Sequence, residues 1–429
     1  MASPKENEKT YSKSVNSWAL YHWAENGYST TIVSAILPVY YSHVAASNLG
    51  SNTATAYWGY TTTITVILAA ILAPMLGTLA NLLGLRKRLL LTFAAIGIFT
   101  TVFLYFVKTG DWAMASLIFI ISNTGFALAD VMHDSLLPHV AKSKDIDRVS
   151  TRGFGFGYLG GGILLAINIA MIQLMTDKGL AARLSFLTVS VWWAVSTIPL
   201  ILNVKEPKAA SSVSPGDSTI LAGYGLLKNT FENMKRYRQL LLFLIAFLVY
   251  NDGIGTIIRM ATIYGADLGL GMSTLIGALL LTLIVGIPFS FFFGWLAKQI
   301  GAKNCIYICL FVYTLISIGG YFINRPIDFW ILAFMVGTVQ GGAQALSRSL
   351  YGSMIPIAKT AEFFGFYGMS SRIGGFMGPL VFALVAQITG NTRFSIVAIV
   401  VFFIAGMILL TRVNVDEGVR TAREEDSHV

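Results

Sequence analysis

The sequence predicts an all-α membrane protein with twelve transmembrane helices, arranged as two parallel six-helix repeats. Three observations predict this fold: an unusually apolar composition, a series of long apolar segments and an internal repeat. The chain has 429 residues and a mean hydropathy of +0.68, and 55% of its residues are hydrophobic whereas only 12% are charged. Soluble domains carry about 25% charged residues, so the composition excludes an ordinary soluble protein.

Each apolar segment approaches the length of about 20 residues that a helix needs to cross the hydrocarbon layer. Apolar residues surround most of these segments rather than alternating, which argues against a barrel of strands. The twelve predicted helices cover residues 17–41, 55–80, 89–107, 112–137, 150–175, 184–203, 238–264, 274–297, 304–324, 329–355, 363–388 and 394–412.

The basic residues predict the orientation. The formal net charge of +9 would suggest a nucleic-acid partner in a soluble chain, but short basic loops between apolar helices give the same total. Of the 30 Lys and Arg residues, 22 fall on the side of the two termini and five on the other side. This bias predicts cytoplasmic termini in the cell (inner) membrane and no nucleic-acid partner.

Five regions follow from this assignment. The cytoplasmic N-terminal tail covers residues 1–16 and lacks the pattern of a signal peptide. Two six-helix bundles, 17–203 and 238–412, flank a polar cytoplasmic linker at 204–237, and a cytoplasmic tail occupies 413–429.

The two bundles repeat each other. Residues 77–84 (GTLANLLG), followed by Arg86, match residues 294–301 (GWLAKQIG), followed by Lys303. Residues 135–138 (SLLP) match residues 353–356 (SMIP) at nearly the same offset. Six helices per repeat keep both repeats in one orientation, which is the major facilitator architecture, with its site near the membrane midplane between the halves.

Several stretches carry a more specific resemblance. They are residues 18–24 (WALYHWA), 250–253 (YNDG), 259–265 (RMATIYG), 344–350 (QALSRSL) and 362–367 (EFFGFY). The chain resembles the vacuole-effluxer-like branch of the major facilitator superfamily, named for the autophagy-related vacuolar amino-acid effluxer. The resemblance implies secondary transport by alternating access, with amino-acid efflux as the activity and no cofactor.

The chain differs from this branch at three positions. The branch usually has Asp where this chain has His22, and Asn where it has Glu25. In the loop after the second helix the superfamily usually has Asp where Asn81 stands, five residues before Arg86. The first two differences change the expected substrate and coupling chemistry, and the third weakens an expected charge contact that helps to hold one conformation.

Charged residues inside a membrane are costly and mark sites or translocation pathways. On the first helix, His22, Glu25 and Asn26 adjoin one face and could relay a proton. The fourth helix carries Asp130, His133 and Asp134 on one face. The alternative for His133 and Asp134 is an interfacial patch that braces the next loop.

The seventh helix carries Asp252 and Arg259 on one face, and Gly253 and Gly255 predict that it unwinds locally to bind a ligand. The alternatives are that the glycines only allow close helix packing and that Arg259 extends to the outer rim.

The tenth helix places Gln340, Gln344 and Arg348 in one stripe. Arg348 either clamps an anionic group of the solute or forms a gate with Asp130, its equivalent in the repeat. Arg372 on the eleventh helix serves either the cavity or the neighbouring loop. Asn81, Arg86, His133, Asp134 and Arg372 are therefore predicted to be gating or structural residues.

Other patterns predict no chemistry. Residues 155–160 (GFGYLG) fit a dinucleotide pattern but follow no strand, so they are interpreted as a helix-packing surface. Cys305 and Cys309 lack His or acidic neighbours and are assigned to the core, and no metal, cofactor or enzyme is predicted.

The predicted function is transport of a small polar solute, with a zwitterion such as an amino acid or short peptide fitting the mixed charges, and with protons as the candidate coupling ion. Three alternatives stay open: an amphiphile or lipid carrier, a non-transporting receptor, and a membrane enzyme that uses His133 with Asp134 or His22 with Glu25 as acid and base.

Overall fold

A computed structural model describes residues 4–49, 51–209, 237–268, 270, 272–373, 375 and 377–427. The first half contains α1 (Pro4–Tyr28), η1 (Ser29–Ala35), α2 (Ile36–Tyr40), η2 (Tyr41–Ala45), α3 (Ser51–Leu83), α4 (Arg86–Phe103), η3 (Leu104–Phe106), α5 (Trp112–Ser135), α6 (Leu137–Val140), η4 (Ser143–Asp145), α7 (Ile146–Leu174) and α8 (Lys178–Asn203). The second half contains α10 (Arg238–Asp267), α11 (Met272–Ile300), α12 (Ala302–Gly320), α13 (Pro326–Ser353), η6 (Ile357–Lys359), α14 (Thr360–Ile373), α15 (Met377–Thr389), α16 (Thr392–Ala398), α17 (Val400–Thr411) and α18 (Val415–Ser427).

All twelve predicted transmembrane segments are helical. Ten helices of the described part are long and apolar enough to cross a membrane. The other two predicted spans correspond to α1 with α2 and to α14 with α15. Hydrocarbon offers no hydrogen-bond partner to backbone groups. Apolar segments of this length therefore form helices, in which the backbone groups hydrogen-bond to one another. The chain is an integral multi-pass membrane protein.

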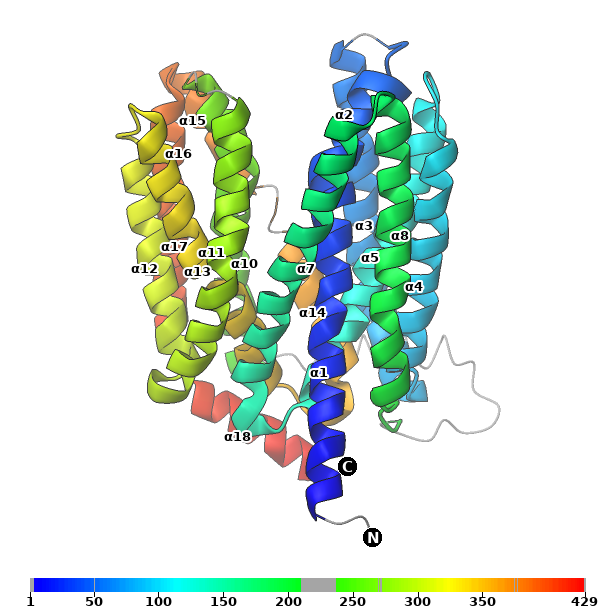
Figure 1. Cartoon of the computed structure of the whole chain (residues 1–429). Coiled ribbons are helices and arrows are strands. Elements are labelled where there is room, and N and C mark those ends of the chain that lie inside the picture. Colours follow the sequence, from blue (N-terminus) through cyan, green and yellow to red (C-terminus); the bar gives the residue numbers. More distant parts are fainter. Residues whose placement is uncertain are drawn as a thin grey trace.

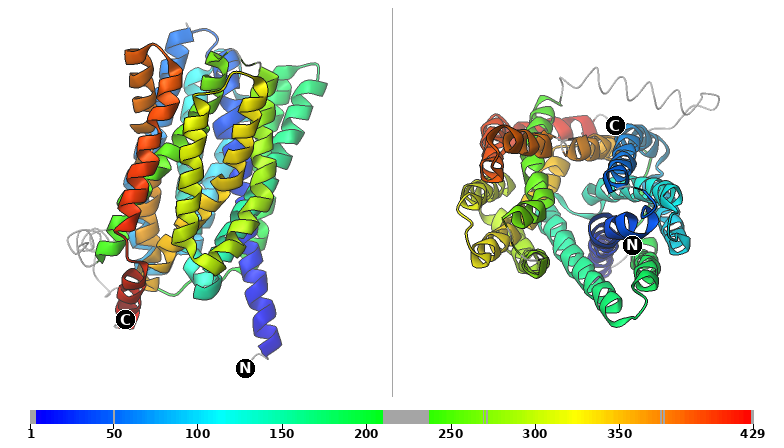
Figure 2. Two further views of the ribbon diagram at one scale, coloured as in Figure 1. Left: turned by 90° about the vertical axis from the view of Figure 1, so that its left-hand side faces the viewer. Right: turned by 90° about the horizontal axis from the view of Figure 1, so that it is seen from above.

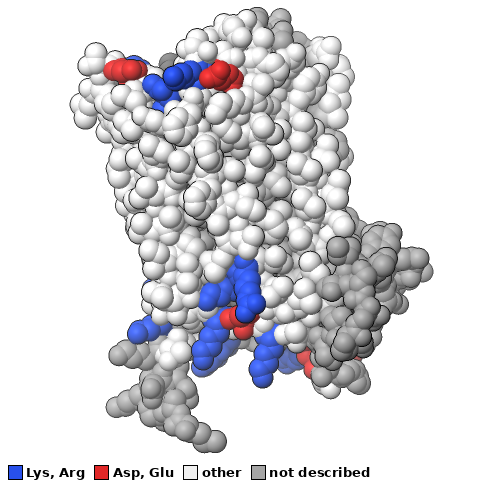
Figure 3. Space-filling model, turned by 90° about the vertical axis from the view of Figure 1, so that its right-hand side faces the viewer, with Lys and Arg blue, Asp and Glu red and all other residues white. Residues whose placement is uncertain are grey.

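The helices form two bundles that stand side by side (Figures 1 and 2). Both termini lie at the same end of the molecule, called here the terminal side. Lys and Arg gather at this end in Figure 3, and a band with few charged residues separates them from a smaller group at the opposite end. This distribution agrees with a membrane between two polar faces.

The repeated sequence motif has a structural basis. Gly84 and Gly301 have φ angles of +63° and +84°, and they follow the equivalent helices α3 and α11. Such left-handed conformations favour glycine and end a helix. Ser135 and Ser353 likewise end the equivalent helices α5 and α13.

One local prediction was wrong. The helix that carries Asp252 does not unwind at Gly253 and Gly255, because α10 is continuous from Arg238 to Asp267. A Cβ atom on Gly253 would lie 2.9 Å from the Phe403 ring, so this glycine allows close packing with α17. The irregularity lies instead in the first span, where η1 and η2 are π-helical.

The glycine-rich start of α7 is a packing surface, as predicted. A Cβ atom on Gly153 would lie 2.3 Å from His22, and one on Gly157 would lie 2.2 Å from Asn26. Gly155 faces Phe291 of α11 in the same way, at 2.8 Å. These glycines let α7 approach α1 on one side and α11 on the other.

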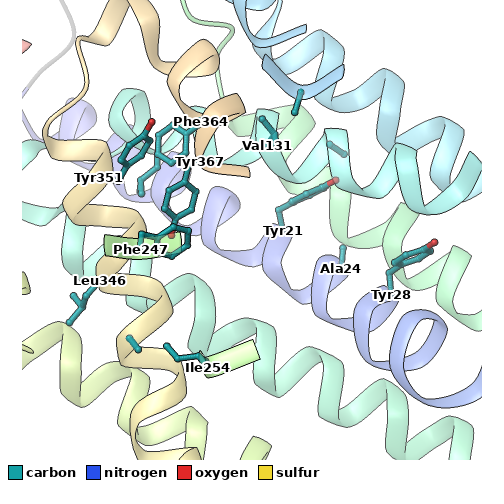
Figure 4. Packing of buried hydrophobic residues seen from close by; sticks show 14 of the residues in the cluster. Tyr21, Ala24, Tyr28, Val131, Phe247, Ile254, Leu346, Tyr351, Phe364 and Tyr367 are labelled. Carbon is teal, nitrogen blue, oxygen red and sulfur yellow. The ribbon is translucent and has the colours of Figure 1, made fainter. Parts of the chain in front are cut away.

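Buried aromatic side chains fill the two halves (Figure 4). Tyr21 and Tyr28 lie along one face of α1, and the Tyr28 hydroxyl is 2.8 Å from that of Ser122 on α5. In the second half, the Tyr367 ring of α14 stacks on Phe247 of α10 at 4.3 Å and on Tyr351 of α13 at 5.0 Å.

The tails and the linker need separate mention. α1 begins at Pro4, within the predicted tail, and its Tyr11 hydroxyl donates to Asp145 at 3.1 Å. The second tail forms α18, whose Glu425 pairs with Lys359 at 3.1 Å. Residues 210–236, most of the predicted linker, lie outside the described residues.

Candidate functional site

The two halves meet on the terminal side. Close contacts occur where a Cβ atom on Gly77 of α3 would lie 2.2 Å from the Ala361 carbonyl oxygen of α14. A Cβ atom on Gly294 of α11 would lie 2.1 Å from the Thr151 hydroxyl of α7. Small residues thus bring backbones of opposite halves into contact, and the structure is closed on this side.

Arg348 of α13 crosses this interface. Its side chain is 3% exposed. Its Nη1 donates to Asp134 Oδ1 of α5 at 2.8 Å, and its Nε and Nη2 donate to the Ser150 hydroxyl and carbonyl oxygens of α7, both at 3.0 Å. The guanidinium also lies over the rings of Trp18 and Phe154 at 5.0 and 4.7 Å. One side chain of the second half therefore contacts three helices of the first.

The acid that pairs with Arg348 differs from the prediction. The repeat suggested Asp130, but the carboxylate at hydrogen-bond distance belongs to Asp134, one helical turn further along α5. Sequence equivalence in a repeat relates positions within each half, and it does not fix which side chains meet across the interface. In this structure Arg348 thus pairs with Asp134, and a gate formed with Asp130 stays a prediction.

A second set of buried groups adjoins Arg348. Its Nη1 lies 2.7 Å from His22 Nε2. The other ring nitrogen of His22 contacts Glu25 Oε2, and Glu25 Oε1 lies 3.0 Å from His133 Nδ1. We call His22, Glu25, His133, Asp134 and Arg348 the buried charge cluster, because the first three are at most 4% exposed and the ion pair is nearly so.

The partners of each histidine determine its hydrogens. Arg348 can only donate, so His22 Nε2 must accept and His22 Nδ1 carries the hydrogen that it donates to Glu25. His133 Nε2 faces the Trp18 carbonyl oxygen at 3.0 Å and must therefore donate. A neutral His133 would then present a lone pair at Nδ1 to the carboxylate of Glu25, so one further proton would be needed to turn this contact into a hydrogen bond.

Charge counting gives the same answer. With neutral imidazoles, the carboxylates of Glu25 and Asp134 and the guanidinium of Arg348 leave a net charge of −1. One proton shared by Glu25 and His133 would bring the net charge of the cluster to zero and so lower the cost of burying it. The geometry can thus hold a proton next to the ion pair that joins the halves.

Three residues of the cluster could also offer ligands to a metal ion. Among the described residues, one donor atom each from His22, Glu25 and His133 lie within 4.8 Å of one another. A metal ion would need a lone pair on His22 Nδ1, which would place the ring hydrogen at Nε2 against the Arg348 donor. The contact with Arg348 therefore favours a proton over a metal ion.

Asn81 and Arg86 form a second connection between the halves. Asn81 Oδ1 accepts from Arg86 Nη2 at 2.8 Å and from the backbone N–H of Ala361 at 3.0 Å. Arg86 Nη2 also donates to the Ala358 carbonyl oxygen at 3.1 Å. The end of α3 and the start of α4 thus bind the N-terminal end of α14, and the amide of Asn81 makes these contacts without a charge.

The predicted residues of the second half are dispersed. Asp252 is buried and accepts at 2.8 Å from the N–H of Gly378, at the start of α15, whereas Arg259 is exposed on the same helix. Gln340 lines an apolar cavity of about 90 Å³ within the second half, and Gln344 is half-buried. The side chain of Arg372 lies outside the described residues.

Several polar contacts across the interface were not predicted. Ser150 binds Arg348 and also donates to the Ala345 carbonyl oxygen at 2.7 Å. The Ser349 hydroxyl donates to Asp147 Oδ1 at 2.5 Å, and His139 Nε2 lies 2.9 Å from the Thr360 hydroxyl. Serine and threonine are common in membrane helices, so the sequence does not mark these residues as special. Only their position at the interface between the two halves sets them apart from other serines and threonines.

Sequence comparisons place the chain among transporters. The family model described as "Vacuole effluxer Atg22 like" matches residues 48–147 and 139–423. The chain is 36% identical to the uncharacterized MFS-type transporter YxiO of Bacillus subtilis, over 97% of this chain and 99% of that protein. It is 24% identical to autophagy-related protein 22 of Gibberella zeae, over 84% of this chain and 68% of the relative.

Solved structures agree on the fold. The proton:xylose symporter XylE has a TM-score of 0.75 at 13% identity and covers 95% of this chain and 96% of its own. The human organic anion transporter MFSD10 has a TM-score of 0.72 at 12% identity, over 93% of this chain and 99% of its own. The chain therefore belongs to the vacuole effluxer Atg22-like family of major facilitator transporters.

Proposed function

We propose that the chain is a proton-coupled secondary transporter of a small polar solute, with amino acids as the solute class, and that it works by alternating access. One observation carries the proposal. Arg348, which joins the two halves, donates both to Asp134 and to His22, and His22 contacts Glu25, which lies 3.0 Å from His133.

Protonation and opening are linked through one atom. His22 Nε2 accepts a hydrogen bond from Arg348 in the state closed on the terminal side. A proton bound at this nitrogen converts it into a donor and gives the ring a positive charge beside a guanidinium. The contact then becomes repulsive, which favours separation of the two halves on this side. Glu25, which touches both imidazoles, is placed to transfer the proton between His133 and His22.

The same step exposes groups that suit a zwitterion. When the halves separate, Arg348 and Asp134 lose each other as partners. The guanidinium can then bind a carboxylate in the bidentate manner, and the carboxylate can bind an ammonium group. An amino acid carries both groups, and the family is named for vacuolar effluxers.

The proposed location is the cell membrane, with the terminal side in the cytoplasm. This orientation is supported by the positive-inside rule, since the sequence assigns 22 of the 30 Lys and Arg residues to the side of the termini, and Lys and Arg gather at this end in Figure 3. In this orientation the closed side of the structure faces the cytoplasm.

Transport by the purified chain in proteoliposomes tests the proposal. Radiolabelled amino acids are offered with and without an imposed pH gradient, with a sugar as the control solute. The gradient is expected to drive accumulation of at least one amino acid. Glu25→Gln removes the shared proton site, so it is expected to lose gradient-driven accumulation but to retain solute exchange without a gradient.

The matched control is Asp111→Asn, which changes a carboxylate that binds only a nearby loop backbone. This variant should accumulate solute like the unmodified chain. An unchanged response of Glu25→Gln to the gradient would contradict proton coupling through the cluster. Flux of the sugar but of no amino acid would contradict the solute class.

A further inference from the structure

A basic groove on the terminal side joins the two halves. It has a volume of about 540 Å³ and lies between the first turns of α7 and the last turns of α11, which run side by side in Figure 1. The described residues that line it include three cations and no acid: Arg148, Thr151, Arg152, Phe156, Phe291, Gly294, Trp295 and Lys298.

The cations of the groove have few partners. Arg148 and Arg152 lie one turn apart on α7, and the Arg152 guanidinium stacks over the Phe156 ring at 5.1 Å. Lys298 lies on α11, and its Nζ is 3.8 Å from Asp145 Oδ1, a distant contact for two half-exposed groups. Positive charge therefore converges on the groove from both halves with little compensation from the described acids.

The other lining groups are apolar and exposed. Phe291 and Trp295 are 42% and 58% exposed on the side of α11. Trp295 lies one turn before Lys298, towards the middle of the membrane span, and Phe291 lies one turn deeper. Tryptophan is enriched at membrane interfaces, where one end of the ring is wet and the other contacts hydrocarbon.

We infer that this groove binds an anionic phospholipid, whose phosphate lies among Arg148, Arg152 and Lys298 and whose acyl chains lie along Phe291 and Trp295. A free anion would use the cations but would leave the exposed parts of these two rings uncovered. A lipid suits both the cations and the rings. Its charged headgroup lies at the membrane surface, as the cations do, and its acyl chains lie deeper, as the rings do.

Binding across the groove has a structural consequence. Arg148 and Arg152 belong to the first half and Lys298 to the second, and Gly294 of α11 packs on Thr151 of α7 at the floor of the groove. A phosphate that contacts all three cations holds α7 and α11 together. The bound lipid therefore stabilises the state closed on the terminal side, and it acts as an effector rather than as transported solute.

Quenching of Trp295 fluorescence by brominated lipids tests the inference. The full chain is reconstituted in nanodiscs of phosphatidylcholine that contain brominated phosphatidylglycerol or, in parallel, brominated phosphatidylcholine. The signal of Trp295 is the difference from a Trp295→Phe variant. Brominated phosphatidylglycerol is expected to quench this signal at lower mole fraction than brominated phosphatidylcholine.

Two double variants complete the experiment. Arg148→Ala with Arg152→Ala is expected to weaken phosphatidylglycerol binding about 30-fold, since each basic side chain near an anionic lipid contributes roughly fivefold in affinity. Arg88→Ala with Lys144→Ala removes two exposed cations outside the groove and should leave the preference unchanged. Thermal unfolding in phosphatidylcholine checks that both variants fold.

Three outcomes would overturn the inference. They are equal quenching by the two brominated lipids, an unchanged preference in the Arg148 and Arg152 variant, and complete displacement of the lipid by millimolar glycerol phosphate, which would identify a site for a free anion.

Discussion

Arg348 of the second half and Asp134 of the first half form a buried ion pair, with 2.8 Å between Nη1 and Oδ1. The same Nη1 atom is 2.7 Å from His22 Nε2. The contact that closes the terminal side is therefore shared with a group that can titrate. The ion pair and the His22 ring thus share one guanidinium nitrogen.

The ion pair predicts energetic coupling in the opening of the terminal side. Ser349 is buried at the interface, so a Ser349→Cys reporter, in a background with Cys305 and Cys309 replaced by alanine, should react with a thiol reagent only when the halves separate. In this background Arg348→Gln or Asp134→Asn should favour opening by about 3 kcal/mol or more, because each leaves a buried charge unpaired.

The double variant decides whether the two residues act together. Arg348→Gln with Asp134→Asn should cost less than the sum of the single changes, with a coupling energy of about 1–3 kcal/mol. A second double-mutant cycle, which combines Arg348→Gln with Asp130→Asn, should give a smaller coupling energy. A larger coupling for Asp130 would show that the pair seen here does not hold the terminal side closed.

Replacing Asn81 by Asp is expected to stabilise the closed state. Its amide nitrogen and Arg86 Nε are both buried without a hydrogen-bond partner among the described residues. Asn81→Asp supplies a second acceptor for Arg86 and a negative charge near the N-terminus of α14, so it should slow labelling of the Ser349→Cys reporter by about 0.5–2 kcal/mol in free energy.

Asn304→Asp is the control for Asn81→Asp, because Asn304 is exposed at the start of α12 and, among the described residues, its side chain binds only a backbone carbonyl. It should leave the labelling rate unchanged. Equal slowing by both changes would indicate a general effect of negative charge rather than the contact with Arg86.

Alanine substitutions at two glycines of α3 are expected to affect opening differently. A Cβ atom on Gly77 would lie 2.2 Å from the Ala361 carbonyl oxygen, whereas one on Gly59 would meet nothing within 4 Å. Gly77→Ala should force α3 away from α14 and favour opening by about 1–3 kcal/mol. Gly59→Ala should not favour opening, so the Ser349→Cys reporter should be labelled at the same rate with and without this change. Similar rates for the two alanine variants would place the closure elsewhere.

Much of the fold could be predicted from the sequence. Long apolar segments leave helices as the structure that satisfies the backbone in a membrane, and the repeated glycines Gly84 and Gly301 mark equivalent helix ends. The π-helical turns of η1 and η2 could not be predicted, because they depend on packing against neighbouring helices rather than on local composition.

The site was predicted less completely. His22, Glu25, His133 and Arg348 stood out because charge is rare in membrane helices, yet nothing in the sequence showed that they form one cluster. Choosing between Asp130 and Asp134 needs the rotation and depth of α5 relative to α13, which the helical period alone leaves undetermined. Ser150 has no charge and so gave no signal.

The pH dependence of opening in a His22→Gln variant tests the central claim most directly. Glutamine keeps an oxygen that can accept from Arg348 but cannot bind a proton in the physiological range. Labelling of the Ser349→Cys reporter is followed from neutral to acidic pH with His22 present and with His22→Gln. Relative to an exposed cysteine labelled at the same pH, which corrects for the loss of thiolate, acidification should accelerate labelling when His22 is present, because a proton at Nε2 opposes Arg348, and it should have little effect in His22→Gln. The same acceleration in both proteins would show that the proton acts elsewhere, and it would contradict the link between His22 and the closing ion pair.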